Sequence, residues 1–327
     1  MTRPGRKALR RSATWLKTQF VDAALILGYH RVVDSETDPF NISVSPKFFE
    51  EHLDVITRLT LPVRLPELVQ DLELGTIRRR SIVVTFDDGY ADFLHEVKPR
   101  LEHAGVPATL FVTSGALGRR FWWEELRHLV LAPERLPHHL SLRLNGGTFE
   151  WVAVGDDGSP RPKDGRNDLL SDLYLRLLPL PDPERSSVLT ELQVKIGTVP
   201  EEQAARPLTP DELVELAASG LVEVGAHSVT HPMLAAVPES AQRWEISESK
   251  RQLEELSGQP VQSFSYPNGS WSPAVGRVVA DGGYSSACGS RFDVVWSRSN
   301  RYHLPRFWVS NRDGEWLARQ LHNWLRA

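Results

Sequence analysis

The sequence predicts an α/β protein of parallel strands and intervening helices, and three observations lead to that fold class. Apolar segments with strand character alternate with helix-like segments over most of the 327 residues, as in βα units. The boundaries of the helix-like segments carry clear capping signals. Polar residues follow several of the expected strands directly, at the ends where barrel enzymes carry their active sites. Seven expected strands with helices between them suggest a barrel related to the eight-stranded kind.

The expected strands are short apolar runs bounded by turn residues. They cover residues 23–29, 63–65, 82–86, 108–113, 221–226, 261–266 and 284–287.

The expected helices are marked by their first and last residues. Ser45-Pro46 opens one helix with a capping residue followed by proline, the usual arrangement at a helix start. Thr209 and Glu212 form a capping-box pattern, with Gly220 placed to end that helix. Two further helices are expected over residues 240–258 and 273–282.

The alternation breaks between residues 119 and 206. Segments 140–144 and 148–154 flank Asn145-Gly146-Gly147, which predicts a hairpin. Helical stretches are expected around 169–178 and 183–196. We therefore assign residues 1–118 and 207–327 to the barrel, and residues 119–206 to an α+β insertion on the active-site face.

Two tryptophans stand at the entry to this insertion, Trp122 and Trp123. Either they line a sugar site, because aromatic faces pack well on pyranose rings, or they anchor the insertion to the barrel.

Composition limits the classes of protein to consider. The 38 Lys and Arg residues nearly balance 42 Asp and Glu, for a net charge of −4, which argues against electrostatic nucleic-acid binding by the whole molecule. The single cysteine, Cys288, cannot form an internal disulfide. No run of 18 apolar residues exists, so no transmembrane helix is expected.

The N-terminus is locally basic. Its first twenty residues contain no acid and six basic residues: Arg3, Arg6, Lys7, Arg10, Arg11 and Lys17. Residues 15–19 interrupt the apolar stretch that a signal peptide would need. We expect a cytoplasmic protein whose basic segment is either solvated or makes peripheral contact with an anionic membrane surface.

Two adjacent carboxylates end the expected strand 82–86. Asp87 and Asp88 belong to the segment TFDDGY, and Gly89 lets the backbone turn sharply after them. Neighbouring residues there point different ways, so one carboxylate can hold a metal while the other faces a substrate. Alone, the pair could equally be a turn with an Asx hydrogen bond.

Two histidines lie four residues apart in the segment HSVTH. His227 and His231 would share one face if the segment makes a helical turn. Alone, such a pair could be two surface histidines. Combined with the paired carboxylates, in this order along a βα chain, the histidines favour a mononuclear metal hydrolase.

These motifs, together with the upstream Gly28-Tyr29-His30-Arg31-Val32, resemble the polysaccharide deacetylase family (NodB homology, carbohydrate esterase 4). The resemblance runs from about residue 25 to residue 309, interrupted by the insertion. It implies a distorted (β/α)7 barrel that removes acetyl groups from N-acetylated sugars with a divalent metal. In the family's motifs, the first aspartate is the catalytic base and the second is a metal ligand. Those roles fall on Asp87 and Asp88, and the remaining metal ligands on His227 and His231.

The family's third motif departs from its usual R-P-P-Y-G form, because this chain has Ser265-Tyr266-Pro267-Asn268-Gly269. Ser265 occupies the arginine position, so the base is expected to lack the arginine that usually orients it. The backbone N–H of Asn268 is the expected oxyanion donor. Tyr266 is a candidate substrate contact.

The general acid of the family, a histidine in a Leu-x-His motif, has no clean match. His303 lies toward the C-terminus, the part of the chain where this motif is expected. His30 is the other imidazole near the end of an expected strand. Each is a candidate for the acid, and each has a structural role as its alternative.

The resemblance implies a de-N-acetylase acting on an N-acetylhexosamine-containing glycan or precursor. Its cofactor would be Zn²⁺, although cobalt, nickel or manganese suits the same donors. Two alternatives stay open. One is a glycan-binding protein with weakened catalysis, suggested by the missing arginine and acid. The other is a hydrolase of a non-sugar amide or an O-acetyl ester.

Overall fold

The computed structural model describes residues 23–35, 37–144, 146–152, 164–197 and 205–326. The expectations for the basic N-terminus, including membrane contact, fall outside this part of the chain. The chain divides into two units, one formed by Met1–Gly115 with Leu208–Ala327 and the other by Ala116–Pro207. Within the described ranges, no helix combines the length and apolar character needed to span a membrane.

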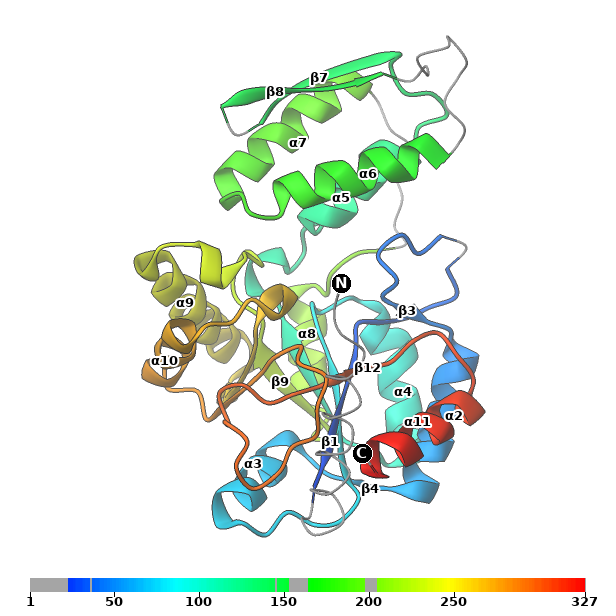
Figure 1. Ribbon diagram of the computed structural model, residues 1–327, viewed down its shortest axis with the longest axis vertical. Coiled ribbons are helices and arrows are strands. Elements are labelled where there is room, and N and C mark those ends of the chain that lie inside the picture. Colours follow the sequence, from blue (N-terminus) through cyan, green and yellow to red (C-terminus); the bar gives the residue numbers. More distant parts are fainter. Residues whose placement is uncertain (1–22, 36, 145, 153–163, 198–204, 327) are drawn as a thin grey trace, which may run out of the picture. The chain divides into compact units, whose positions relative to one another are not determined.

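A curled parallel sheet forms the centre of the first unit (Figure 1). Its strands are β1 (Leu25–Tyr29), β4 (Leu61–Pro62), β5 (Ser81–Phe86), β6 (Ala108–Val112), β9 (Val222–Ala226), β10 (Ser263–Ser265), β11 (Ser286–Cys288) and β12 (Phe307–Trp308). Their order is β11-β10-β9-β6-β5-β1-β12, with β4 paired to the start of β5. A separate short ladder joins β2 (Arg31–Val32) to β3 (Ser43–Val44).

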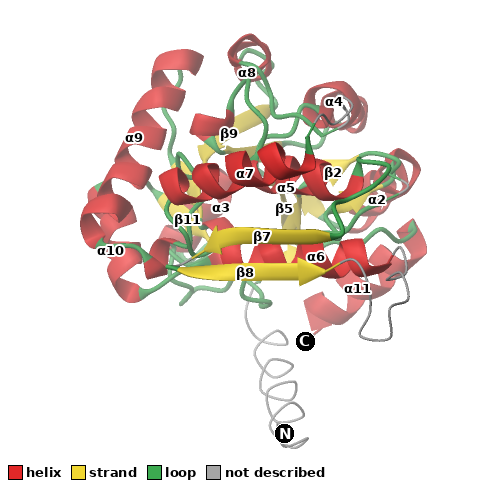
Figure 2. Cartoon of the chain, turned by 90° about the horizontal axis from the view of Figure 1, so that it is seen from above, coloured by secondary structure: helices red, strands yellow, loops and turns green. Residues whose placement is uncertain are grey.

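Helices surround this sheet, as Figures 1 and 2 show from two directions. They are α2 (Pro46–Leu59), α3 (Leu65–Leu74), α4 (Lys98–Ala104), α8 (Pro210–Ala217), α9 (Glu239–Ser257), α10 (Pro273–Asp281) and α11 (Gly314–Arg326), with a π-helical turn at Phe93–Val97. Helices α9 and α10 lie together on one flank, and α2 and α11 on the other. The arrangement confirms the predicted α/β barrel class.

The central strands are apolar because both of their faces are covered. Every residue of β1 and β5 is buried, which explains continuous apolar runs in place of alternation. All strand pairings in this sheet are parallel, so the strands' carboxyl ends lie at one edge. That edge carries the motif residues.

The capping signals predicted the helix starts well. Ser45 accepts a hydrogen bond from the backbone N–H of Phe48. Thr209 and Glu212 complete the predicted capping box reciprocally. The helix that begins there ends at Ala217, before Gly220.

One expected strand, 63–65, is wrong. Pairing with β5 begins earlier, at Leu61–Pro62, and Leu65 already belongs to α3. Pro66 explains the shift, because proline is favoured in the first turn of a helix.

The second unit contains α5 (Trp122–Leu131), the antiparallel strands β7 (His139–Leu144) and β8 (Gly147–Val152), α6 (Asp164–Leu177) and α7 (Asp182–Ile196). The predicted hairpin is confirmed, with Leu144 opposite Gly147. Helix α5 packs on α6 and α7, and β7 packs on α7.

Candidate metal centre and active site

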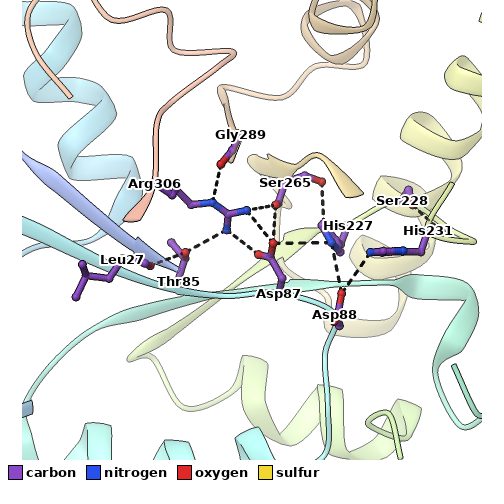
Figure 3. A network of polar contacts seen from close by, with 10 residues as sticks. All are labelled: Leu27, Thr85, Asp87, Asp88, His227, Ser228, His231, Ser265, Gly289 and Arg306. Carbon is purple, nitrogen blue, oxygen red and sulfur yellow. Dashed lines mark hydrogen bonds and ion pairs between the residues drawn. The ribbon is translucent and has the colours of Figure 1, made fainter. Parts of the chain in front are cut away.

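The candidate site lies where the central strands end (Figure 3). Asp87 and Asp88 follow β5, and His227 follows β9, two strands away across β6. All three side chains are buried. The parallel register therefore brings the two sequence motifs together, although 138 residues separate Asp88 from the next ligand candidate (227 against 88).

Three donor atoms converge at this edge. The Oδ1 atom of Asp88 lies 3.5 Å from Nε2 of His227 and 3.5 Å from Nε2 of His231. The three side chains can offer ligand atoms that all lie within 4.8 Å of one another. Two imidazole nitrogens and one carboxylate oxygen form a donor set that suits Zn²⁺. The residues present therefore fit a single divalent transition metal.

The orientation of His227 is set by a backbone carbonyl. Its Nδ1 lies 2.8 Å from the carbonyl oxygen of Ser265. Since a carbonyl only accepts, Nδ1 carries the proton, and Nε2 keeps its lone pair toward Asp88. Burial lowers the pKa of His227, against the opposing effect of Asp87. A neutral imidazole held this way is typical of metal ligands.

The segment from His227 to His231 does not make a helical turn, so the condition for a shared helix face is not met. The segment after β9 is a loop in which Ser228 and His231 have positive φ angles of 64° and 59°. The hydroxyl of Ser228 accepts a hydrogen bond from the backbone N–H of His231 at 3.0 Å. This loop brings the two imidazole rings to a centroid separation of 5.0 Å.

Left-handed backbone is concentrated at the motifs. The described non-glycine residues with positive φ are Asn41, Arg80, Asp88, Ser228, His231 and Asn268. Four of these six belong to the three sequence motifs. Such residues each cost about 1–3 kcal/mol and persist where surrounding structure holds them, which is a feature of functional sites.

Asp87 has an arginine partner, contrary to expectation. Arg306 forms a two-pronged ion pair with it, with Nη1 at 2.7 Å from Oδ1 and Nη2 at 2.8 Å from Oδ2. Ser265, which occupies the arginine position of the motif, accepts from Nη2 at 2.8 Å and donates to Asp87 at 3.1 Å. The arginine therefore reaches Asp87 from another place in the chain (Figure 3).

The guanidinium of Arg306 is held on every side. It donates to the Gly289 carbonyl and to the hydroxyl of Thr85, and its plane lies 4.5 Å from the Trp308 ring centroid. Arg306 as a whole is 1% exposed to solvent. Burial alone would raise the pKa of Asp87, but the charge of Arg306 holds that pKa well below its usual range. Asp87 is thus ionised and fixed in orientation.

A weak signal for Arg306 was present in the sequence. Leu304-Pro305-Arg306 immediately precedes an aromatic pair that forms β12. That strand pairs with β1, which in turn pairs with β5. Only this tertiary pairing identifies the arginine as a neighbour of Asp87.

The two acid candidates lie in different surroundings. His30 stacks on Trp308 with a centroid separation of 4.7 Å, and burial lowers its pKa to about 4 despite the nearby Asp87. His303 stacks on Trp271 at 3.9 Å, and burial also lowers its pKa. The His303 ring packs on Gly289, where an added Cβ would lie 2.6 Å from the ring. Neither placement assigns the acid, and both roles stay predictions.

The third motif forms a turn after β10. Asn268 lies exposed in this turn with a positive φ of 52°. Tyr266 is 1% exposed, and its hydroxyl donates to the Tyr302 carbonyl at 2.7 Å. The oxyanion role of Asn268 stays a prediction. The substrate role of Tyr266 also stays a prediction, and the burial of its side chain does not support it.

The two tryptophans of the second unit are largely buried. Trp122 stacks on Tyr174 at 5.3 Å and lies under the guanidinium of Arg185. Trp123 stacks on Phe121 at 4.6 Å. These contacts fit a packing role inside the unit, and a sugar-binding role stays a prediction.

Comparison with protein families identifies a match that extends over both sides of the second unit. The family model described as polysaccharide deacetylase matches residues 75–139 and 183–287, just over half of the chain. Among curated proteins, YxkH of Bacillus subtilis (strain 168), a candidate polysaccharide deacetylase, is 26% identical over 114 residues. The match covers 33% of this chain and 38% of that protein.

Solved structures share the fold at lower identity. The deacetylase PplD of Streptococcus pyogenes, in complex with acetate, superposes with a TM-score of 0.60 at 17% identity, covering 92% of this chain and 99% of that one. A de-N-acetylase from Aggregatibacter actinomycetemcomitans gives a TM-score of 0.58 at 16% identity, covering 92% and 100% of the two chains. These likenesses establish the fold.

Proposed function

The chain belongs to the polysaccharide deacetylase family, and from this premise we propose that it is a metal-dependent de-N-acetylase. The proposed substrate is an N-acetylhexosamine-containing glycan or glycan precursor. The observation that carries the proposal is the convergence of Asp88, His227 and His231 beside an ionised Asp87. Support comes also from structural neighbours whose names include a de-N-acetylase and a deacetylase with bound acetate.

The proposed metal ligands are the three converging side chains. Asp88, His227 and His231 would hold one divalent cation, with Zn²⁺ the first choice for this donor set. When bound, such an ion supplies Lewis-acid polarisation of an acetyl carbonyl and lowers the pKa of water toward 7. The Ser265 carbonyl keeps His227 in the ligating tautomer.

Asp87 is the proposed general base. It points away from Asp88, toward Ser265 and Arg306 (Figure 3). Its ionised form is the one that accepts a proton from water. Arg306 keeps the carboxylate charged and fixes both of its oxygens, which positions the base at some cost in basicity.

The remaining roles rest on position in the motifs. The backbone N–H of Asn268 would stabilise the oxyanion of the tetrahedral intermediate. Removal of one such donor raises the activation free energy by about 3 kcal/mol. His30 or His303 would return a proton to the leaving amine. With burial lowering both pKa values, either imidazole would acquire that proton during the reaction.

The arginine partner of Asp87 weakens one alternative function. A glycan-binding protein without turnover was suggested partly by the missing arginine, and Arg306 supplies that group. A hydrolase of a non-sugar amide or an O-acetyl ester would use the same residues, so substrate screening must separate these cases.

The test is acetate release from metal-loaded protein. We would screen free, nucleotide-linked, lipid-linked and polymeric N-acetylhexosamines, with O-acetylated sugars as the competing class. Asp87→Asn should lower the rate by about 10²–10⁴-fold, while Zn²⁺ content stays unchanged. Full activity in Asp87→Asn would overturn the base assignment, and release from O-acetyl esters alone would overturn the de-N-acetylase proposal.

A further inference from the structure

The loop that carries the second histidine is held by a carboxylate from another element. Glu245 lies on α9 and is 6% exposed. Its Oε2 accepts hydrogen bonds from the backbone N–H groups of Val229 and Thr230, at 2.8 and 2.9 Å. Its Oε1 accepts from the Thr230 hydroxyl at 2.5 Å. One side chain thus binds three donors of the segment between the two proposed ligands.

The loop needs such support because its backbone is not regular. Ser228 and His231 both adopt left-handed conformations, which cost free energy unless neighbouring groups hold them. A non-helical segment also lacks internal backbone partners for its N–H groups. Buried donors of this kind must be satisfied from elsewhere, and here the carboxylate of Glu245 does so.

The opposite side of the loop is fixed by the end of β6. The backbone N–H of Ser114 donates to the Ser228 carbonyl, and that of Gly115 to the Val229 carbonyl. At Gly115, an added Cβ would lie 2.6 Å from the Val229 oxygen, so only glycine allows this approach. The loop is therefore held between a strand end and Glu245.

We propose that Glu245 is a positioning residue for the metal centre: by fixing the backbone of residues 229 and 230, it sets the place of His231 relative to His227 and Asp88. This inference rests on the proposed metal site. Groups that orient metal ligands without touching the metal commonly change metal affinity by about 10–100-fold when they are removed. We expect that range for loss of the Glu245 carboxylate.

Three variants separate the contributions. Glu245→Leu removes all three hydrogen bonds. Glu245→Gln keeps an oxygen for the two backbone donors and places an amide N–H₂ group opposite the Thr230 hydroxyl, so it should retain most of the affinity. Thr230→Val removes only the hydroxyl bond, and serves if Glu245→Leu does not fold.

Glu223 provides the matched control. It lies on β9, where its carboxylate accepts from the hydroxyls of Thr109 and Ser263 at 3.0 and 2.9 Å. It shares the strand that precedes the loop, and its two hydrogen-bond partners lie on the neighbouring strands β6 and β10. Glu223→Leu should lower the melting temperature of the metal-free protein without weakening metal binding.

The measurement is the Kd for Zn²⁺ by competition with a chromophoric chelator, together with the visible spectrum of the Co²⁺-loaded protein and the melting temperature in EDTA. Glu245→Leu should bind Zn²⁺ about 10–100-fold more weakly with an altered Co²⁺ spectrum, and Thr230→Val should be weakened less. If wild type binds Zn²⁺ and Glu245→Leu binds within about twofold of it, the inference is wrong. If the wild-type protein binds no Zn²⁺, the proposed metal site itself fails.

Discussion

The ion pair between Arg306 and Asp87 allows a quantitative test of the site's construction. Arg306→Leu removes a guanidinium that is 1% exposed and leaves a buried carboxylate without its cationic partner. Breaking a buried pair from one side costs about 3–5 kcal/mol, whereas replacing both partners with apolar residues costs much less. We therefore expect Arg306→Leu to lose about 3–5 kcal/mol of unfolding free energy at pH 7. The double variant Asp87→Leu/Arg306→Leu should recover part of this loss.

The loss should depend on pH in a defined direction. The pKa of Asp87 is held below its unfolded value by Arg306, against the effect of burial. A carboxyl of this kind contributes stability that is complete above the unfolded pKa and disappears as the pH falls through the folded pKa. The difference between wild type and Arg306→Leu should therefore be largest near neutrality and shrink below about pH 4.

The assay is urea denaturation followed by tryptophan fluorescence, in EDTA so that no metal contributes. Arg291→Leu serves as the control, because its pair with Asp293 is partly exposed, with a separation of 3.6 Å, and should contribute less than about 1 kcal/mol. A loss below about 1 kcal/mol for Arg306→Leu, or a double variant no more stable than the single one, would refute the reasoning.

Three further predictions concern the metal donors, the buried thiol and His30. Zn²⁺ at 100 times its Kd should stabilise the wild-type protein by about 2.7 kcal/mol, measured as a thermal shift that Asp88→Asn abolishes and the exposed His103→Ala retains; an undiminished shift in Asp88→Asn would contradict the ligand assignment. Burial raises the pKa of Cys288 to about 12, so Ellman's reagent at pH 8 should label it only after denaturation, and rapid labelling of native protein would disprove this. Because burial lowers the pKa of His30 to about 4, its imidazole in metal-free protein should stay neutral at pH 6 by nitrogen NMR, with His30→Gln identifying the signal. The depressed folded pKa of His30 also means that stability falls as the pH drops from about 6.5 toward 4, and His30→Gln should lose less over that interval; an equal loss would contradict it.

Features that act over a few residues could be predicted from the sequence. Ser45 caps a helix through a donor three residues away, and Thr209 and Glu212 bind each other across the same distance. The carboxylates at the end of β5 were also predictable, because an apolar run followed by a polar pair and glycine describes a buried parallel strand and its turn. Parallel pairing places them at the same edge of the sheet as the end of β9, and the strand order β9-β6-β5 then brings the two ends close together.

Features that depend on tertiary contacts could not be predicted this way. The spacing of His227 and His231 fits a helix, but a loop held by Glu245, fourteen positions beyond His231, brings them together. Because Ser265 occupies the position of the family's arginine, Asp87 was expected to lack an arginine partner. The arginine partner is Arg306, and the pairing of β12 with β1 places it beside Asp87. Neither the contact of Glu245 with the loop nor that of Arg306 with Asp87 can be inferred from local sequence patterns.

The separation of Asp87 from Arg306 has a consequence for how the protein matures on the ribosome. The two residues are 219 positions apart, and synthesis at roughly 5–20 residues per second delivers the arginine about 11–44 s after the aspartate. All three proposed metal donors precede it in the chain. A nascent or truncated chain that stops before residue 306 would hold a complete set of ligands beside an uncompensated carboxylate. We therefore expect the ion pair that orients Asp87 to form only after residue 306 has been added, later than the three proposed metal donors.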